Sequence, residues 1–72
     1  MNWVNFSSSY VNKALYESGT LFVQYKDAKG RPTVTCQYDN VGLDIWTGLL
    51  SSPSKGRFVN SHIRSLPYKI VG

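Results

Sequence analysis

Residues 21–40 read LFVQYKDAKGRPTVTCQYDN, and two strands can be recognised in this stretch. Leu21, Val23 and Tyr25 occupy alternate positions, which places them on one face of an extended chain. Residues 33–40 alternate in the same way and are likewise rich in β-branched and aromatic types, which favour strands. The stretch therefore predicts two strands, each with an apolar and a more polar face.

The segment between these strands, KDAKGRP, has the composition of a hairpin connection. Gly30 is expected at a positive φ, because glycine adopts that conformation without a steric penalty. Pro32 cannot donate a backbone hydrogen bond to the sheet. The pattern also predicts a second face on the first strand, shared by Phe22, Gln24 and Lys26.

The residues before this hairpin extend the sheet. Residues 10–17 alternate, with Ala14 and Tyr16 on one face and Lys13 and Glu17 on the other. A turn at Gly19 and Thr20 would join this strand to the next, giving three strands in an antiparallel meander. Residues 1–9 read as a lead-in whose rings pack on the body, and Trp3 with Phe6 is a candidate exposed contact.

After Asp39 the apolar period lengthens. Leu43, Trp46 and Leu50 are spaced by three and four residues, which predicts a short helix within residues 41–52. Gly48 weakens that helix, and Trp46 is expected to anchor it on the sheet.

A second helix is predicted within residues 51–65. Ser52 before Pro53 fits a helix cap followed by the first helical position, and Ser54 is the rival cap. Pro67 is expected to stop the helix, and residues 68–71 to return as a short edge strand. Helices that follow strands indicate the α+β class. The prediction is one domain, residues 1–72 with a core of about 7–70, in which two short helices pack on one face of a three-stranded meander.

The titratable residues limit the chemistry. One cysteine, Cys36, permits no intrachain disulfide, and with one histidine, His62, there is no Cys/His pattern for zinc. No metal or cofactor is expected. Four carboxylates in scattered positions define no acid/base pair, so we expect no catalytic residues and no enzyme activity. The free cysteine and the lack of a secretory signal or a long apolar run predict a cytoplasmic protein without a membrane span.

A family resemblance rests on the region of the second helix. The pattern SxGxFxN..I....Y is formed by Ser54, Gly56, Phe58, Asn60, Ile63 and Tyr68. With the preceding strands it resembles the KTSC domain, over roughly residues 7–68. That family is named for the C-terminus of some lysyl-tRNA synthetases and includes small bacterial and phage proteins. The resemblance implies the fold and a suggested role in RNA binding. Members tend to carry Tyr-x-Tyr in the third strand, where this chain has Cys36 in place of the first tyrosine.

The charge balance bears on partners. Eight Lys and Arg against four Asp and Glu give a net charge of +4, which favours nucleic acid or an acidic protein surface. The start of the second helix combines free N–H groups with basic side chains, an arrangement that attracts phosphate. The predicted contacts to RNA or single-stranded DNA are Lys55, Arg57, Arg64, Lys29 and Arg31.

Two other interpretations stay open. The chain fits a phage-type interaction module that regulates or inhibits a host polymerase, nuclease or defence complex. In that case shape-specific contacts from Trp3, Phe6 or the open sheet face would matter more than total charge. A structural domain whose basic bias has no partner is the third interpretation.

Overall fold

The computed structural model describes residues 3–72 and shows an α+β fold built on a five-stranded sheet. The strands lie in chain order, β1-β2-β3-β4-β5, and each pairs antiparallel with the next. The elements are β1 (Val4–Asn5), β2 (Val11–Glu17), β3 (Thr20–Lys26), β4 (Pro32–Tyr38), α1 (Leu43–Ser51), α2 (Lys55–His62) and β5 (Lys69–Ile70).

The predicted meander of three strands is confirmed as the centre of the sheet, but the sheet has five strands rather than three. The additional strands, β1 and β5, have two residues each and lie at the edges. β5 confirms the expected edge strand within residues 68–71. β1 forms inside the segment read as a lead-in, of which residues 1–2 lie outside the described residues.

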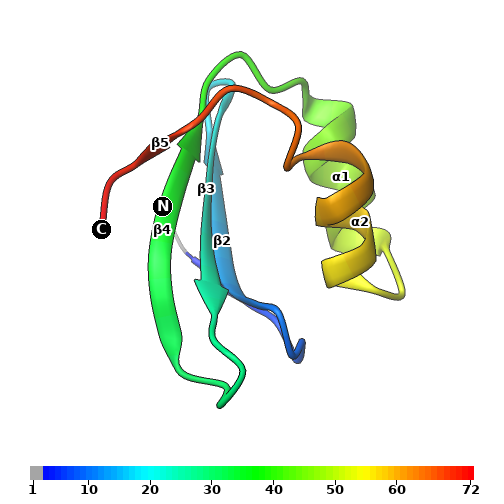
Figure 1. The fold of residues 1–72 in the computed structure, drawn as a ribbon. Helices are drawn as coiled ribbons and strands as arrows, with labels where there is room; N and C mark the ends of the chain where they lie inside the picture. Colours follow the sequence, from blue (N-terminus) through cyan, green and yellow to red (C-terminus); the bar gives the residue numbers. More distant parts are fainter. Residues whose placement is uncertain (1–2) are drawn as a thin grey trace.

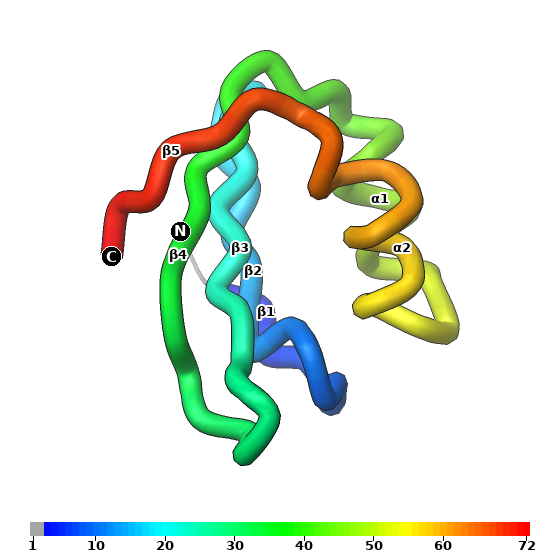
Figure 2. Tube along the Cα trace, in the orientation of Figure 1, coloured from blue at the N-terminus to red at the C-terminus, as the bar shows by residue number. Residues whose placement is uncertain are grey.

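Both helices lie on the same face of the sheet, as the packing prediction required (Figure 1). The tube in Figure 2 follows the chain from β4 over one end of the sheet into α1, and from α2 back to the outer side of β4 as β5. The molecule therefore has two layers, and within residues 3–72 no element covers the other face of the sheet. Among the residues described, no helix is both long and apolar enough to cross a membrane.

The core lies between the two layers. Leu21 and Val23 of β3 are fully buried, as are Val59 and Ile63 of the α2 region. The other buried hydrophobic residues are Val11, Ala14, Tyr25, Cys36, Tyr38, Val41 and Leu49. Cys36 therefore points inward from β4 and lies in the core. Leu21, Val23 and Tyr25 of β3, and Cys36 and Tyr38 of β4, have the alternate spacing from which strand faces are predicted. In β2 the alternation fails at Val11, which is buried together with Ala14 because the pairing register shifts between Val11 and Lys13.

The hairpin turns use left-handed backbone. Between β2 and β3, Ser18 has φ 50° and Gly19 has φ 84°, the pair of positive values that a type I′ turn requires. Between β3 and β4, Gly30 has φ 78°, which confirms the expected positive value. A type I′ turn matches the twist of the strands it joins, so the pairing of β2 with β3 is supported locally.

Aromatic contacts attach α1 to the rest of the core layer. Trp46 stacks on Tyr16 of β2 with ring centroids 5.7 Å apart, which confirms its anchoring role. The Tyr16 hydroxyl donates to the carbonyl of Val41 at 2.6 Å. At Gly48 a methyl group would lie 2.8 Å from the Phe58 ring of α2, so the two helices approach closely because this position has no side chain.

The boundaries of α2 differ from the prediction. Ser54, not Ser52, is the cap, and its hydroxyl accepts from the backbone N–H of Arg57 at 3.4 Å. Pro53 therefore lies in the connecting loop. The helix ends at His62, five residues before Pro67, and the intervening residues form turns. This early end lets the chain cross back to β4 and form β5.

Candidate nucleic-acid interface

The two basic residues of the β3–β4 hairpin are held by one carboxylate. Asp27 Oδ1 accepts from the backbone N–H groups of Lys29 and Arg31, both at 2.9 Å. The Arg31 side chain pairs with Asp27 Oδ2 at 3.4 Å. The N–H of Arg31, more than that of Lys29, holds the pKa of Asp27 below its ordinary value. The charge of Arg31 is therefore already paired within the turn.

Lys55 has a structural role in the loop between the helices. Its ammonium donates to the carbonyl of Leu50 at 2.9 Å and to that of Ser52 at 2.7 Å, and it lies 5.3 Å from the centre of the Phe6 ring. The last carbonyls of a helix lack intrahelical partners, and a cation there also complements the helix dipole. Lys55 thus caps the end of α1. Phe6 packs against the core and is not an exposed contact.

Arg57 and Arg64 are the exposed cations of the α2 region. Both side chains are exposed, as is Ser61, which lies between them in the sequence. Arg64 donates to the Asn60 amide oxygen at 3.4 Å. In the described part of the chain, neither arginine forms an ion pair.

The expected phosphate position at the start of α2 coincides with a pocket of about 390 Å³. Hydroxyl-bearing side chains line it from two segments that are far apart in sequence: Ser7, Ser8, Ser9, Ser52 and Ser54. Ser8 is partly committed, because its hydroxyl accepts from the N–H groups of Tyr10 and Val11.

The five predicted contacts therefore do not form one continuous surface, and they differ in how far their charges are already paired. Lys55 is used within the helical layer, Arg31 is paired within a turn, and Lys29 lies on that same turn. Arg57 and Arg64 remain as free charges at the start of α2 and just beyond its end. The structure points to a different surface as the more continuous candidate.

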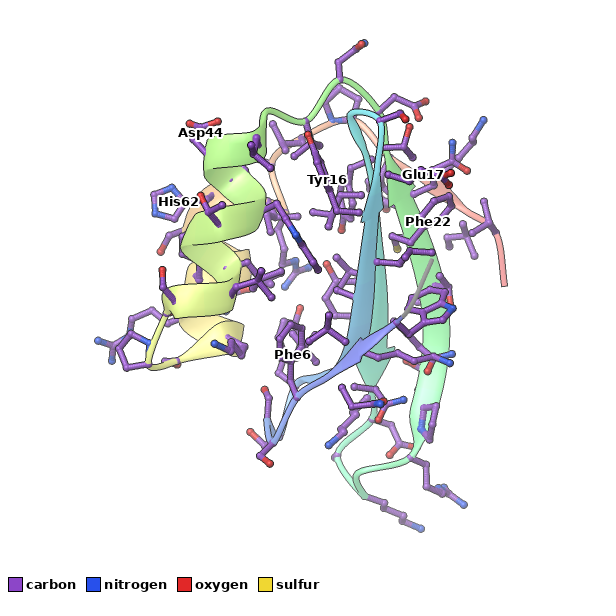
Figure 3. All side chains as sticks on the ribbon, turned by 180° about the vertical axis from the view of Figure 1, so that it is seen from behind. Phe6, Tyr16, Glu17, Phe22, Asp44 and His62 are labelled. Carbon is purple, nitrogen blue, oxygen red and sulfur yellow. The ribbon has the colours of Figure 1, made fainter. Side chains whose placement is uncertain are left out.

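That surface is the sheet face that no helix covers, here called the open face. Figure 3 shows Phe22 and Glu17 directed away from the helices, with Tyr16 directed toward them. Direct cross-strand pairs define one row across the face: Leu15 lies opposite Phe22, Phe22 opposite Gln37, and Gln37 opposite Lys69. The row passes from apolar residues through an amide to a cation.

A second row runs beside the first. Lys13 lies opposite Gln24, and Gln24 opposite Thr35. The Gln24 amide accepts from Asn12 at 2.7 Å and donates to the Thr35 hydroxyl at 3.4 Å. These bonds hold the Gln24 side chain in one orientation on the face.

Trp3 completes the open face from the edge. Its ring meets Phe22 edge to face with centroids 6.4 Å apart, and the Lys13 ammonium lies 4.6 Å from the ring centre. Trp3 is 36% exposed, which agrees with its prediction as an exposed contact. The sequence gives little signal for this placement, because β1 is too short to show alternation.

Lys26 is the exception to the predicted face. The alternation places it beside Gln24, but its ammonium donates to the Ser8 carbonyl at 2.7 Å. The pairing register shifts between Gln24 and Lys26, and such an irregularity redirects the side chains that follow it. Among residues 3–72, the cross-strand pairs place Lys13 and Lys69 on the open face, one near each edge.

Most positions of the family pattern serve the fold. Ser54 caps α2, and a methyl group at Gly56 would lie 3.2 Å from Tyr10. Phe58 fills the space at Gly48, and Ile63 is fully buried. Across residues 3–72, no three His, Cys, Asp or Glu side chains gather as a metal site.

Comparison with known proteins supports the resemblance. The model of the KTSC domain matches residues 7–68. The crystal structure of a KTSC domain protein from Yersinia pestis is similar, with a TM-score of 0.85 and 24% identity over 99% of this chain and 97% of that one. That structural likeness shows a shared fold. A comparison with curated proteins found no match. Because the family model covers most of the sequence, the chain belongs to the KTSC domain family.

Proposed function

We propose that the protein is a non-catalytic module that binds RNA or single-stranded DNA on the open face of its sheet. The observation that carries this proposal is the co-location of Trp3 and Phe22 with amide and lysine side chains on a surface that neither helix covers.

Stacking would supply most of the affinity. Unpaired bases stack on aromatic side chains, and each stacked base contributes about 1–3 kcal/mol. Trp3 and Phe22 are neighbours whose ring planes differ by 61°, so they offer two adjacent stacking positions rather than one flat surface. The Gln24 and Gln37 amides lie beside them and can pair with base edges. Double-stranded nucleic acid offers no free base faces, so single strands are the expected ligand.

Electrostatic attraction would supply the rest of the binding affinity. Lys13 and Lys69 flank the two rings, and the net charge of +4 favours association with a polyanion. Arg57 and Arg64 lie on the opposite layer, where they form the competing surface named in the sequence prediction. Cytoplasm stays the expected compartment, and no cofactor enters the proposal.

The test is a fluorescence-polarisation titration with a labelled single-stranded RNA and its DNA counterpart at two salt concentrations. Binding should weaken with salt, with a log–log slope of about −0.7 per phosphate contacted. Phe22→Ala should reduce affinity about tenfold, because one stacking ring is lost. Leu43→Ala, an exposed position on α1, is the matched control and should leave affinity unchanged.

A second pair of variants separates the two surfaces. If Arg57→Glu with Arg64→Glu abolishes binding while Phe22→Ala does not change it, the α2 face is the interface and the open-face proposal is wrong. Absence of binding by the wild-type protein at low salt would reject nucleic-acid binding altogether.

One observation favours the alternative, a phage-type interaction module acting on a host enzyme complex. Leu43 and Leu50 lie two turns apart on α1 and are 62% and 39% exposed. Exposed apolar residues on one side of a helix are typical of protein contacts. If this alternative holds, Leu43→Ala should lose a captured partner that Phe22→Ala retains.

A further inference from the structure

A pocket on the helix-covered side of the sheet is separate from the open face and shares only Arg64 with the basic surface of the α2 region. It measures about 380 Å³, within the range of small-molecule sites, and lies between β4, β5 and the residues that follow α2. Tyr25 and Cys36, both buried, form part of its lining. Its more exposed lining comes from Val34, Ile70 and Tyr68.

Aromatic rings occupy several sides of this pocket. Tyr10 lies 5.2 Å from Tyr25 between ring centroids, and both rings line the space. Tyr68, which also lines it, is 59% exposed and lies 6.0 Å from Tyr38. An enclosure of phenol rings and aliphatic side chains favours a flat aromatic ligand over a flexible or strongly hydrated one.

Charge in the pocket comes from one side chain. Arg64 lines it, and among the described residues no carboxylate pairs with that arginine. The Tyr25 hydroxyl is 2.6 Å from that of Tyr38. Burial raises the pKa of Tyr25 far above its ordinary value, and it also raises that of Tyr38. Both phenols therefore stay neutral and do not repel an anion.

We propose that this pocket binds a small planar aromatic molecule that carries an anionic group, with its ring among Tyr10, Tyr25 and Tyr68 and its anion on Arg64. Phosphate and carboxylate both fit a guanidinium, so a nucleoside monophosphate and an aromatic acid share the required chemistry. This site is independent of oligonucleotide binding on the open face.

The test is a ¹H–¹⁵N NMR titration of the full chain with adenosine 5′-monophosphate and, separately, with 4-hydroxybenzoate. At least one should shift the backbone amides of Cys36 and Arg64 while leaving those of Lys13 and Phe22 unchanged. A response to the first probe alone identifies a ring with a phosphate, and a response to the second alone identifies a ring with a carboxylate. Adenosine and inorganic phosphate, as the separated halves, should bind much more weakly.

Two variants complete the test. Arg64→Gln should lower the affinity for the responding probe about tenfold or more. Arg57→Gln removes the same charge from the same helical region and should leave that affinity unchanged. Val34→Trp should block the pocket without changing net charge, because Val34 lines the pocket and lies 39% exposed on a strand. The proposal is overturned if neither probe shifts these amides, if both arginine variants act alike, or if phosphate alone binds as well as the whole probe.

Discussion

The same strands contribute to both faces of the sheet, but the two faces differ in burial and in composition. On the covered face, β3 contributes Leu21 and Val23, both fully buried beneath the helices. On the open face the intervening residues, Phe22 and Gln24, are only partly buried and meet amides, lysines and Trp3. Alternation alone separates the two sets. Stability should therefore depend on one set of residues and binding on the other.

The largest expected effect tests that division directly. Leu21→Ala should destabilise the fold by about 2–5 kcal/mol, because it removes buried methyl groups and leaves a cavity. Leu15→Ala, on the open face, should cost about 1 kcal/mol because Leu15 is only partly buried. Urea denaturation followed by circular dichroism measures both. Equal losses would mean that the open face also supports the fold.

A domain of this size has a small free energy of unfolding. If Leu21→Ala is already unfolded without urea, its denaturation curve gives no free energy, and a milder variant is needed. Ile63→Val is the milder substitution on the covered side. Ile63 is fully buried, and the change should cost about 0.5–1.5 kcal/mol.

The next effect concerns the cap of α2. Ser54→Ala should cost about 1 kcal/mol, because the backbone N–H of Arg57 loses its side-chain acceptor. Ser61→Ala, at an exposed position within the same helix, is the control and should change the free energy of unfolding little. The same denaturation experiment measures both. A loss confined to Ser61→Ala would contradict the observed helix start.

A comparison of Lys55 with Arg57 tests whether a basic side chain that bonds to the fold stabilises it more than an exposed one. Lys55→Met should destabilise the fold by up to about 1 kcal/mol, since its ammonium caps the carbonyls at the end of α1. Arg57→Met should leave stability unchanged, because its side chain is exposed and forms no ion pair among the described residues. Thermal unfolding at matched pH compares them. If the order is reversed, Lys55 is not a structural residue.

The smallest expected effect on stability is at the β3–β4 hairpin, at one end of the sheet. The N–H of Arg31 holds the pKa of Asp27 below its ordinary value, so the ionised form is favoured in the folded state. Ionised Asp27 therefore adds to the free energy of unfolding at pH values above its unfolded-state pKa. This stabilisation is lost as the pH falls through its lower folded-state pKa. NMR titration of the Lys29 and Arg31 amides should show a midpoint below that of an aspartate in an unfolded peptide. In Asp27→Asn that titration should disappear, and a midpoint at or above the peptide's would contradict the bonded turn.

Residue spacing was sufficient for the central architecture. The period of two in residues 10–17, 21–26 and 33–38 predicts β2, β3 and β4 and most of their inward faces, because strand side chains alternate. Val11 is the exception, since the register shift beside it depends on pairing with β3. The period near 3.6 that follows predicts both helices. These signals are local, so they can be read before any packing is known.

The site required contacts between distant segments. No local pattern places Trp3 on Phe22, pairs Lys69 with Gln37, or commits Lys55 to the end of α1, because each contact joins segments that only the folded chain brings together. The same holds for the pocket that joins Tyr10 to Arg64. Sequence spacing specified which side of each element is apolar, from steric alternation and helical pitch. The packing of distant segments determined which charges are paired, which face stays open and where a cavity remains.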